Sequence, residues 1–229
     1  MTEQEFKIIE DWAKQEKAEK VRRFRELNEI ARKGQIVFAG SSLMEQFPIY
    51  EMLLDRQLPY TIYNRGIGGY TTTELLDNLD ACVTGLEPGT VFLNIGTNDM
   101  NGDDYILEDF LERYERIVIS IQKKLPDTRL FLLAFYPVNQ DAATDPNARE
   151  AFRCRTNERI QEANREIRKI ADRHHAFYLD LNAGLIDEEG RLKMELTIDG
   201  VHMHVEGYQK VIEELLPVLE EIFERPTCE

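Results

Sequence analysis

The 229-residue chain has few cysteine and histidine residues, a single tryptophan and no long apolar run. Its three cysteines, Cys82, Cys154 and Cys228, are widely spaced and form no CxxC pair, which argues against a disulfide framework. No segment approaches the roughly 18 consecutive apolar residues that a membrane-spanning helix needs. The N-terminus is charged within three residues and lacks the apolar core of a secretory signal. We therefore expect a cytoplasmic protein without a membrane segment.

Negative charge outnumbers positive charge. The chain has 28 Lys and Arg residues against 43 Asp and Glu residues, which gives a formal net charge of −15. Such a surface repels phosphate backbones and anionic bilayers, so we expect neither nucleic acid nor membrane as a partner. Hydrophobic residues make up 42% and charged residues 31% of the chain, as in ordinary globular proteins, and the length suits one core.

The N-terminal 34 residues differ from the rest. Apolar residues recur at three-and-four spacing along residues 2–33, which predicts a helix, and a densely charged stretch at residues 14–25 lies between them. We expect residues 1–34 to form a helical extension that packs on a main domain of residues 35–229. The alternative is an interaction arm, and a homodimer would most readily form through this helix.

From residue 35 onward, short β-branched or aromatic segments alternate with longer amphipathic ones. The segments that we expect to form strands are Ile36–Ala39, Thr61–Asn64, Thr90–Ile95, Arg129–Phe135 and Ala176–Asp180. Those that we expect to form helices are Thr73–Leu86, Asp104–Leu125, Arg149–His174 and Val205–Glu224. Alternation of this kind predicts a parallel sheet covered on both faces, and therefore an α/β fold.

Small, hydroxyl and amide residues follow the predicted strands. In an open parallel sheet, ligands bind beyond the carboxyl ends of the strands, near the point where the strand order reverses. The segments expected at that edge are Gly40-Ser41-Ser42, Asn64–Gly69, Gly96–Asp99 and, before the last helix, Asp199–His202. A loop at residues 136–146 follows the fourth strand there, and we expect it to line or cover a cleft.

Each segment alone also has a structural explanation. A Gly-Ser pair often marks a turn, and Gly66, Gly68 and Gly69 are suited to positive φ angles. Asparagine commonly caps helices, so Asn98 also fits an N-cap. Asp199 and His202 also fit an ion pair within a loop. The conjunction of the four segments therefore carries the functional prediction, rather than any one of them.

Together the segments hold the parts that acyl transfer requires. Ser42 is a hydroxyl nucleophile that needs a base, His202 is suited to accept its proton, and Asp199 is suited to hold the imidazole in the productive tautomer. The backbone N–H groups of Ser42 and Gly69 and the side-chain amide of Asn98 are the expected donors to the oxyanion.

These four segments, in this order, resemble the sequence blocks of the SGNH hydrolase superfamily, also called GDSL-like esterases and lipases. The resemblance covers about residues 35–224 and is nearest to bacterial relatives of platelet-activating-factor acetylhydrolase. It implies a flavodoxin-like three-layer α/β/α sandwich with a five-stranded parallel sheet. It also implies Ser42, Asp199 and His202 as the catalytic triad, Ser42, Gly69 and Asn98 as the oxyanion hole, and no cofactor.

The family's Gly-Asp-Ser is Gly40-Ser41-Ser42 in this chain, which leaves Ser41 as an alternative nucleophile. The expected substrate is a small ester with a short acyl group such as acetyl. A carbohydrate O-deacetylase, a short-chain lipid esterase and a thioester hydrolase all stay open. Arg65 either meets an anionic leaving group or lies exposed.

Three rival functions are weaker. Gly66-Ile67-Gly68 departs from a dinucleotide fingerprint because its sixth position is Thr71. A metal site at His202 and His204 lacks a supporting ligand motif, and His174 and His175 fit a helix C-terminus. A non-catalytic binding protein on the same fold is the third rival.

Overall fold

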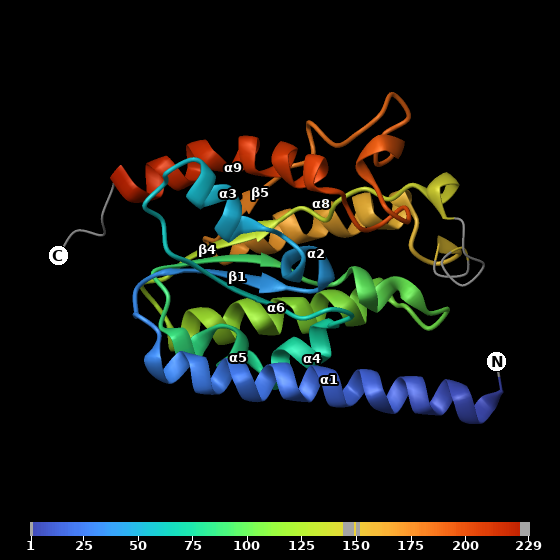
Figure 1. Cartoon of the computed structure of the whole chain (residues 1–229), viewed down its shortest axis with the longest axis horizontal. Coiled ribbons are helices and arrows are strands. Elements are labelled where there is room, and N and C mark those ends of the chain that lie inside the picture. The colour runs from blue at the N-terminus through green and yellow to red at the C-terminus, as the bar shows by residue number, and fades with distance from the viewer. Residues whose placement is uncertain (1, 144–148, 150–151, 225–229) are drawn as a thin grey trace.

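The computed structural model describes residues 2–143, 149 and 152–224 (Figure 1). Its centre is a five-stranded sheet with the order β2-β1-β3-β4-β5, in which every neighbouring pair is parallel. The strands are β1 (Ile36–Gly40), β2 (Ile62–Gly66), β3 (Thr90–Asn94), β4 (Arg129–Leu133) and β5 (Phe177–Leu179). The predicted α/β fold with a five-stranded parallel sheet is confirmed.

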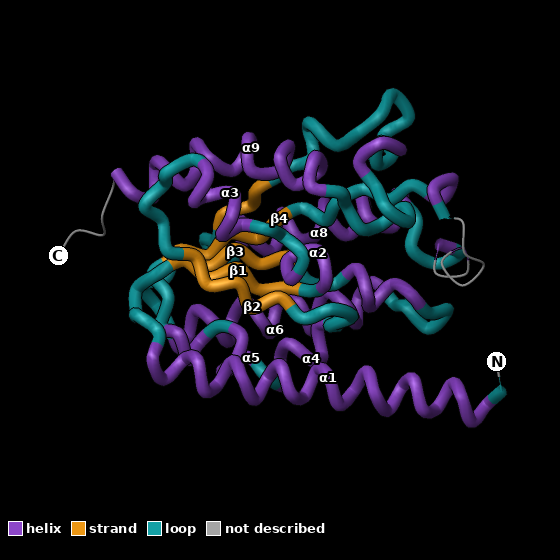
Figure 2. The backbone as a smooth tube through the Cα atoms, viewed as in Figure 1, coloured by secondary structure: helices purple, strands orange, loops and turns teal. Residues whose placement is uncertain are grey.

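Helices cover both faces of this sheet, which forms the central layer in Figure 2. Alternate residues of β1 and β3 enter two separate apolar clusters, as the pleat of a strand requires. The first cluster takes in residues of α1 (Glu3–Ile30), α4 (Thr72–Asp77), α5 (Leu79–Cys82), α6 (Leu107–Lys124) and α8 (Asn157–Arg173). The second takes in residues of α2 (Ser42–Glu45), α3 (Ile49–Asp55) and α9 (Val205–Glu224).

The strand order reverses between β1 and β3. The chain passes from β1 to β2 on one side, and then returns to β3 on the other side of β1. The connections that leave the carboxyl ends of β1 and β3 therefore diverge, which opens a crevice at this edge of the sheet. Only Ser41 separates Ser42 from the end of β1, and Asn98 lies in the 3₁₀ turn η2 (Thr97–Asn101) after β3, so both belong to that crevice.

Two predicted helices have different bounds in the structure. The segment Thr73–Leu86 is not one helix but α4, α5 and the 3₁₀ turn η1 (Thr84–Leu86). Its break is at Asn78, whose side chain donates to the carbonyl of Glu74 and so competes with the helix backbone. The last internal helix begins at Asn157 rather than Arg149, because Thr156 caps it by accepting a hydrogen bond from the Arg159 N–H.

The five strands and helix α6 are close to their predicted bounds. β3, β4 and β5 end one or two residues before the predicted ends, β2 is displaced toward the C-terminus, and α6 starts at Leu107. The short helices α2 and α3, and the 3₁₀ turns η3 (Gln140–Ala142) and η4 (Met194–Leu196), were not expected from the sequence.

The N-terminal helix α1 has two different halves. Its C-terminal half packs on the sheet domain through buried Val21 and Asn28, and Asn28 donates a hydrogen bond to the carbonyl of Ala81. Its N-terminal half exposes Ile8, Ile9 and Trp12, the last of which is 64% exposed. The division at residue 34 and the homodimer stay predictions. None of the described helices combines the length and apolar character needed to cross a bilayer.

Candidate active site

The turn after β1 places Ser42 at the start of α2. Gly40 is required there, because a Cβ at this position would lie 2.2 Å from the carbonyl oxygen of Asn94. Ser41 is the residue before α2, is 2% exposed, and accepts the backbone N–H groups of Met44 and Glu45 at its carbonyl. Ser42, in contrast, is partly exposed.

Ser42 is hydrogen-bonded to a residue 160 positions later in the chain. Its Oγ lies 2.9 Å from Nε2 of His202, and Nδ1 of the same ring lies 2.6 Å from Oδ2 of Asp199. Because an ionised carboxylate only accepts hydrogen bonds, Nδ1 carries the ring proton and Nε2 is left to accept from the serine hydroxyl. The three predicted triad residues are thus brought together in the required order.

A tight loop between Thr197 and Met203 fixes the spacing of Asp199 and His202. The Thr197 hydroxyl donates to the carbonyl of His202 and accepts from the N–H of Gly200, both at 2.8 Å. Gly200 has a φ of +96° and packs against Asn139, where a Cβ would lie 2.2 Å from the backbone oxygen. Glycine is therefore needed for the turn and for this close approach.

The environment of Asp199 holds it in the charged form. Burial raises the pKa of Asp199, whereas hydrogen bonds from the His202 ring and from the N–H groups of His202 and Val201 lower it. The net result is a pKa well below the ordinary value for aspartate. A permanently ionised carboxylate is what the imidazole needs when it becomes positively charged.

The segment after β2, residues 67–72, is named the glycine loop here. Ile67–Tyr70 is a β-turn closed by a 3.1 Å hydrogen bond, and Gly69 occupies its third position with a φ of +71°. Gly66 precedes the turn and is needed for close approach, because a Cβ there would lie 2.3 Å from the backbone nitrogen of Glu45. Of the three glycines, only Gly69 has the positive φ expected from the sequence.

The backbone N–H of Gly69 is free in the described part of the chain. The other N–H groups of the glycine loop all have acceptors, which in chain order are Gly40 O, Glu45 Oε2, Ile67 O, Glu74 Oε2 and Asp99 Oδ2. The N–H of Ser42 likewise has no acceptor among the described residues. A Cβ on the adjacent Gly68 would lie 4.0 Å from Cβ of Ser42, so the loop borders the serine.

Asn98 is oriented by two hydrogen bonds and does not cap a helix. Its Nδ2 donates to the carbonyl of Tyr70 at 2.9 Å, and its Oδ1 accepts from Nη2 of Arg155 at 2.8 Å. One hydrogen of the amide therefore holds the glycine loop, and the second has no acceptor in the described residues. The three predicted oxyanion donors thus each retain an available N–H.

The segment Gly96–Asp99, which carries Asn98, is also joined to the glycine loop through the carboxylate of Asp99. Both oxygens of Asp99 accept from Thr72, one from its backbone N–H and the other from its hydroxyl. Arg113 donates to the Thr72 hydroxyl and lies 3.5 Å from the Asp99 carboxylate, which is 4% exposed. These contacts hold the two donor segments together.

The sequence pattern did not single out Arg155. This side chain is 6% exposed, and its Nε has no hydrogen-bond partner in the described structure. Burial lowers the pKa of Arg155 to about 10, and the charge of Asp199 opposes that shift, so the guanidinium stays charged at neutral pH. Arg155 lies inside the predicted helix Arg149–His174 and belongs to no motif, so only the fold reveals its contact with Asn98.

Both expectations for Arg65 are wrong. Its side chain is 5% exposed and lies beneath α1, where Nε and Nη2 donate to Oδ1 of Asn28. The guanidinium also stacks over the rings of Phe24 and Tyr63. Arg65 therefore docks α1 onto β2 rather than meeting a substrate or solvent.

The loop after β4 is more buried than its sequence suggests. Asn157 and Asn164 of α8 each bond both the N–H and the carbonyl of one residue, Val138 and Phe135 respectively. The N–H of Asn139 then donates to the carbonyl of Gly200, beside His202. The part of the predicted loop at residues 144–146 lies outside the described residues, and its role over the cleft stays a prediction.

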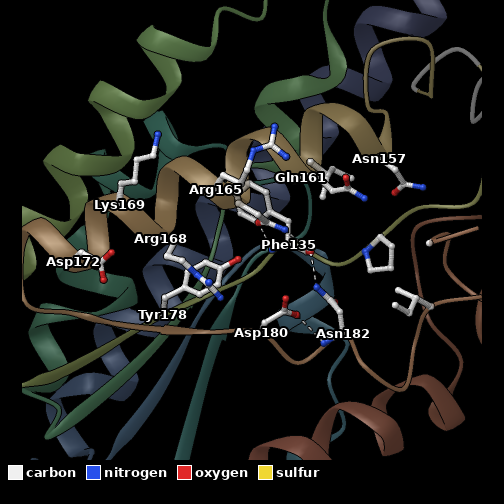
Figure 3. A pocket seen from close by; sticks show the side chains of 15 residues that line it. Phe135, Asn157, Gln161, Arg165, Arg168, Lys169, Asp172, Tyr178, Asp180 and Asn182 are labelled. Carbon is white, nitrogen blue, oxygen red and sulfur yellow. Dashed lines mark hydrogen bonds between the residues drawn. The ribbon is translucent and has the colours of Figure 1, made fainter.

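A separate cavity of about 570 Å³ lies between α8 and β5 (Figure 3). Arg165 and Arg168 of α8 lie on one side of it, and Asn182 and Tyr178 on the other, with the Arg168 guanidinium over the Tyr178 ring. None of its lining residues is a predicted site residue.

His202 and His174, two of the histidines considered as metal ligands, are hydrogen-bonded to protein side chains. His174 is the C-cap of α8, and its Nε2 lies 2.6 Å from Oε1 of Glu115. Within the described ranges, no three His, Cys, Asp or Glu side chains gather in a way that could hold a metal ion.

Known proteins share both the fold and the sequence pattern. A structure from Streptococcus pneumonia, provisionally described as a platelet activating factor, superposes with a TM-score of 0.85 and is 32% identical, over 96% of this chain and all of that one. Such coverage includes most of residues 1–34. The platelet-activating factor acetylhydrolase IB subunit alpha2 of Rattus norvegicus is 22% identical over 190 residues, which are 82% of this chain and 77% of the subunit.

A more distant structure shares the fold. An acetyl xylan esterase superposes with a TM-score of 0.63 at 20% identity, over 81% of this chain and 99% of its own. Residues 38–210 match the GDSL-like Lipase/Acylhydrolase family, a span that holds all four sequence blocks. The chain therefore belongs to the GDSL-like lipase/acylhydrolase family, as the resemblance of its blocks to SGNH hydrolases indicated.

Proposed function

We propose that this protein is a serine ester hydrolase that removes short acyl groups, in particular acetyl, through an acyl-enzyme on Ser42. The observation that carries the proposal is the continuous hydrogen-bonded chain from Ser42 Oγ through the His202 ring to Asp199 Oδ2. Family membership supports ester hydrolysis as the reaction class.

In the first half-reaction, Ser42 Oγ attacks the ester carbonyl carbon while its proton moves to Nε2 of His202. Asp199 stabilises the imidazolium that results. The carbonyl oxygen becomes an oxyanion, which accepts hydrogen bonds from the N–H groups of Ser42 and Gly69 and from Asn98 Nδ2. The C–O bond to the alcohol then breaks, and His202 protonates the departing oxygen.

In the second half-reaction, a water molecule replaces the alcohol. His202 takes a proton from the water, the hydroxide attacks the acyl carbon, and the same three donors hold the second oxyanion. The bond from the acyl carbon to Ser42 Oγ breaks, the proton returns to the serine, and the carboxylic acid leaves. No cofactor enters either step.

The names of two similar proteins support an acetyl group. The acetylhydrolase subunit and the acetyl xylan esterase share the acetyl group in their names but differ in the substrate named, which is platelet-activating factor in one and xylan in the other. The acyl group is therefore the part of the substrate that we propose, and a panel of acetylated lipids and acetylated sugars will identify the alcohol.

The test compares purified wild type with Ser42→Ala and His202→Ala on p-nitrophenyl acetate, butyrate and octanoate. Since the two residues act as a unit, both variants should lose nearly all activity, and the acetate ester should be the preferred substrate. The matched control is Ser41→Ala, which alters the neighbouring buried hydroxyl and should keep most of the activity. Undiminished hydrolysis by Ser42→Ala rules the mechanism out, and a wild type that binds esters without cleaving them supports a binding protein instead.

A further inference from the structure

Helix α1 reaches the glycine loop as well as the sheet. It runs alongside α4 and α5, the elements that follow this loop (Figure 1). Lys17 and Lys20 lie three positions apart, so they share one face of α1. Each is about one-quarter exposed, and each points toward the domain rather than into solvent.

Lys17 holds the carbonyl side of Gly69. Its Nζ donates to the carbonyl oxygen of Gly69 at 2.9 Å and to Oε1 of Glu74 at 2.8 Å. The other oxygen of Glu74 accepts the N–H of Thr71, within the same loop. One ammonium group therefore fixes the glycine turn directly and braces the carboxylate that caps the next helix.

Lys20 holds the other side of the same turn through Glu45. Its Nζ lies 2.7 Å from Oε1 of Glu45, and Oε2 of that carboxylate accepts the N–H of Gly68 at 2.8 Å. Glu45 belongs to α2, three residues after Ser42. The Glu45 carboxylate thus joins three elements: α1, the helix that begins at the serine, and the loop that carries the Gly69 N–H.

The two contacts bracket the Gly69 N–H, for which the described residues provide no acceptor. Gly68 is anchored at its nitrogen and Gly69 at its oxygen, and the peptide between them carries the Gly69 N–H. Glycine pairs have little intrinsic preference for one backbone conformation, so external anchors must define where this N–H lies. An oxyanion donor is effective only when it is held in place before the reaction.

We propose that Lys17 and Lys20 are positioning residues, through which α1 sets the location of the Gly69 N–H relative to Ser42. This inference rests on the proposed function, because it assigns Gly69 the role of oxyanion donor. It makes the N-terminal helix a working part of the site, rather than an addition to a complete domain.

The experiment uses the full chain with Lys17→Gln, Lys20→Gln and the double substitution. Lys14→Gln is the matched control, because Lys14 lies one turn earlier on α1 and is exposed. Rates on p-nitrophenyl acetate are divided by the number of active sites, counted by complete labelling with a fluorophosphonate. Unfolded molecules, which do not label, then leave the measured kcat unaffected.

We expect kcat to fall about tenfold in each single variant, because displacing a donor costs less than removing it. KM should change by less than about twofold, since the donors act mainly on the transition state. The affinity of a boronic acid, which forms a tetrahedral adduct on serine, should weaken in parallel with kcat. Lys14→Gln should match the wild type, and Lys17→Arg, which keeps a cationic donor, should recover much of the loss.

A double-mutant cycle tests the contact that runs from Lys20 through the Glu45 carboxylate to the Gly68 N–H. Glu45→Gln keeps an oxygen for the Gly68 N–H but loses the charge that pairs with Lys20. If the route is correct, the double variant with Lys20→Gln is no worse than either single variant. The proposal is overturned if kcat per labelled site stays within twofold of wild type in Lys17→Gln and Lys20→Gln while Ser42→Ala is inactive. A wild type that neither labels nor hydrolyses esters refutes the proposed function, and this inference with it.

Discussion

The guanidinium of Arg155 donates a 2.8 Å hydrogen bond to the amide oxygen of Asn98, inside the protein. An amide side chain has two orientations of similar shape, and only one presents its NH₂ group to the crevice. Because the Arg155 guanidinium has donors and no acceptor, its contact requires the amide oxygen of Asn98 to face Arg155. The NH₂ group then faces the glycine loop, where it donates to the carbonyl of Tyr70. The charge also polarises the amide, which strengthens the remaining N–H as a donor.

Replacing Arg155 with Met should therefore lower kcat on p-nitrophenyl acetate by about 10–100-fold, somewhat less than the 10²–10³-fold expected for loss of a donor. KM should change little. In the background of Asn98→Ala, which should itself lower kcat by about 10²–10³-fold, the same substitution should have almost no further effect. Full additivity of the two losses would show that Arg155 acts by another route.

Gly69→Ala tests the backbone conformation of the glycine loop. At a φ of +71°, alanine is strained by about 1–2 kcal/mol, and the turn can relieve this only by rotating the peptide that carries the N–H. Gly34→Ala is a matched control, since Gly34 has a φ of +75° and no atom of the other described residues, its two chain neighbours aside, would lie within 4 Å of the added methyl. Both variants should lose similar stability in urea titrations, and only Gly69→Ala should lose kcat, by at least about tenfold. Equal activities would remove Gly69 from the oxyanion hole.

The lowered pKa of Asp199 predicts how stability depends on pH. Above the pKa of the unfolded chain, about 3.9, both states are ionised and the stabilisation is fully present. As the pH falls below that value, the unfolded state binds a proton first, and the stabilisation is lost as the pH approaches the lower folded pKa. The difference in Tm between wild type and Asp199→Asn should therefore shrink from about pH 4 to about pH 2. A difference that is constant or grows over this range is inconsistent with a charged, hydrogen-bonded Asp199.

Tyr208 of α9 supports the helix that begins at Ser42. Its hydroxyl donates to the carbonyl of Leu43 at 3.0 Å in a buried contact, and its ring stacks on Phe47. Tyr208→Phe leaves this carbonyl unpaired and should lower the free energy of unfolding by about 1–2 kcal/mol. Tyr136→Phe is the control, because the Tyr136 hydroxyl is buried with no partner in the described structure, and its loss should be neutral or stabilising. Denaturant titrations measure both, and equal effects would contradict the assignment.

The parallel sheet and the ends of its strands could be predicted because the pattern is local. The predicted strands Ile36–Ala39 and Thr90–Ile95 are largely apolar, and a glycine follows each of them at once. Short buried strands of an α/β protein have this form. The break in the helix at Asn78 was missed, because the apolar periodicity continues through it and only the side chain of Asn78 interrupts the backbone.

The residues that face the substrate in the proposed mechanism were predictable because each occupies a fixed place in a sequence block. The residues that hold them were not. The contacts of Glu45, Lys17 and Arg155 join residues that are 23–57 positions apart in sequence. In the sequence, each of the three looks like an ordinary charged surface residue. The same reason explains the error at Arg65, whose burial depends on α1 covering β2.

Labelling the wild-type protein with a fluorophosphonate, followed by mass-spectrometric mapping of the modified residue, tests the role of Ser42 directly. The proposed triad predicts a single adduct on Ser42, formed rapidly in the wild type and slowly after His202→Ala, with none on Ser41. An adduct on Ser41, or rapid ester hydrolysis by protein that carries no adduct, would contradict it.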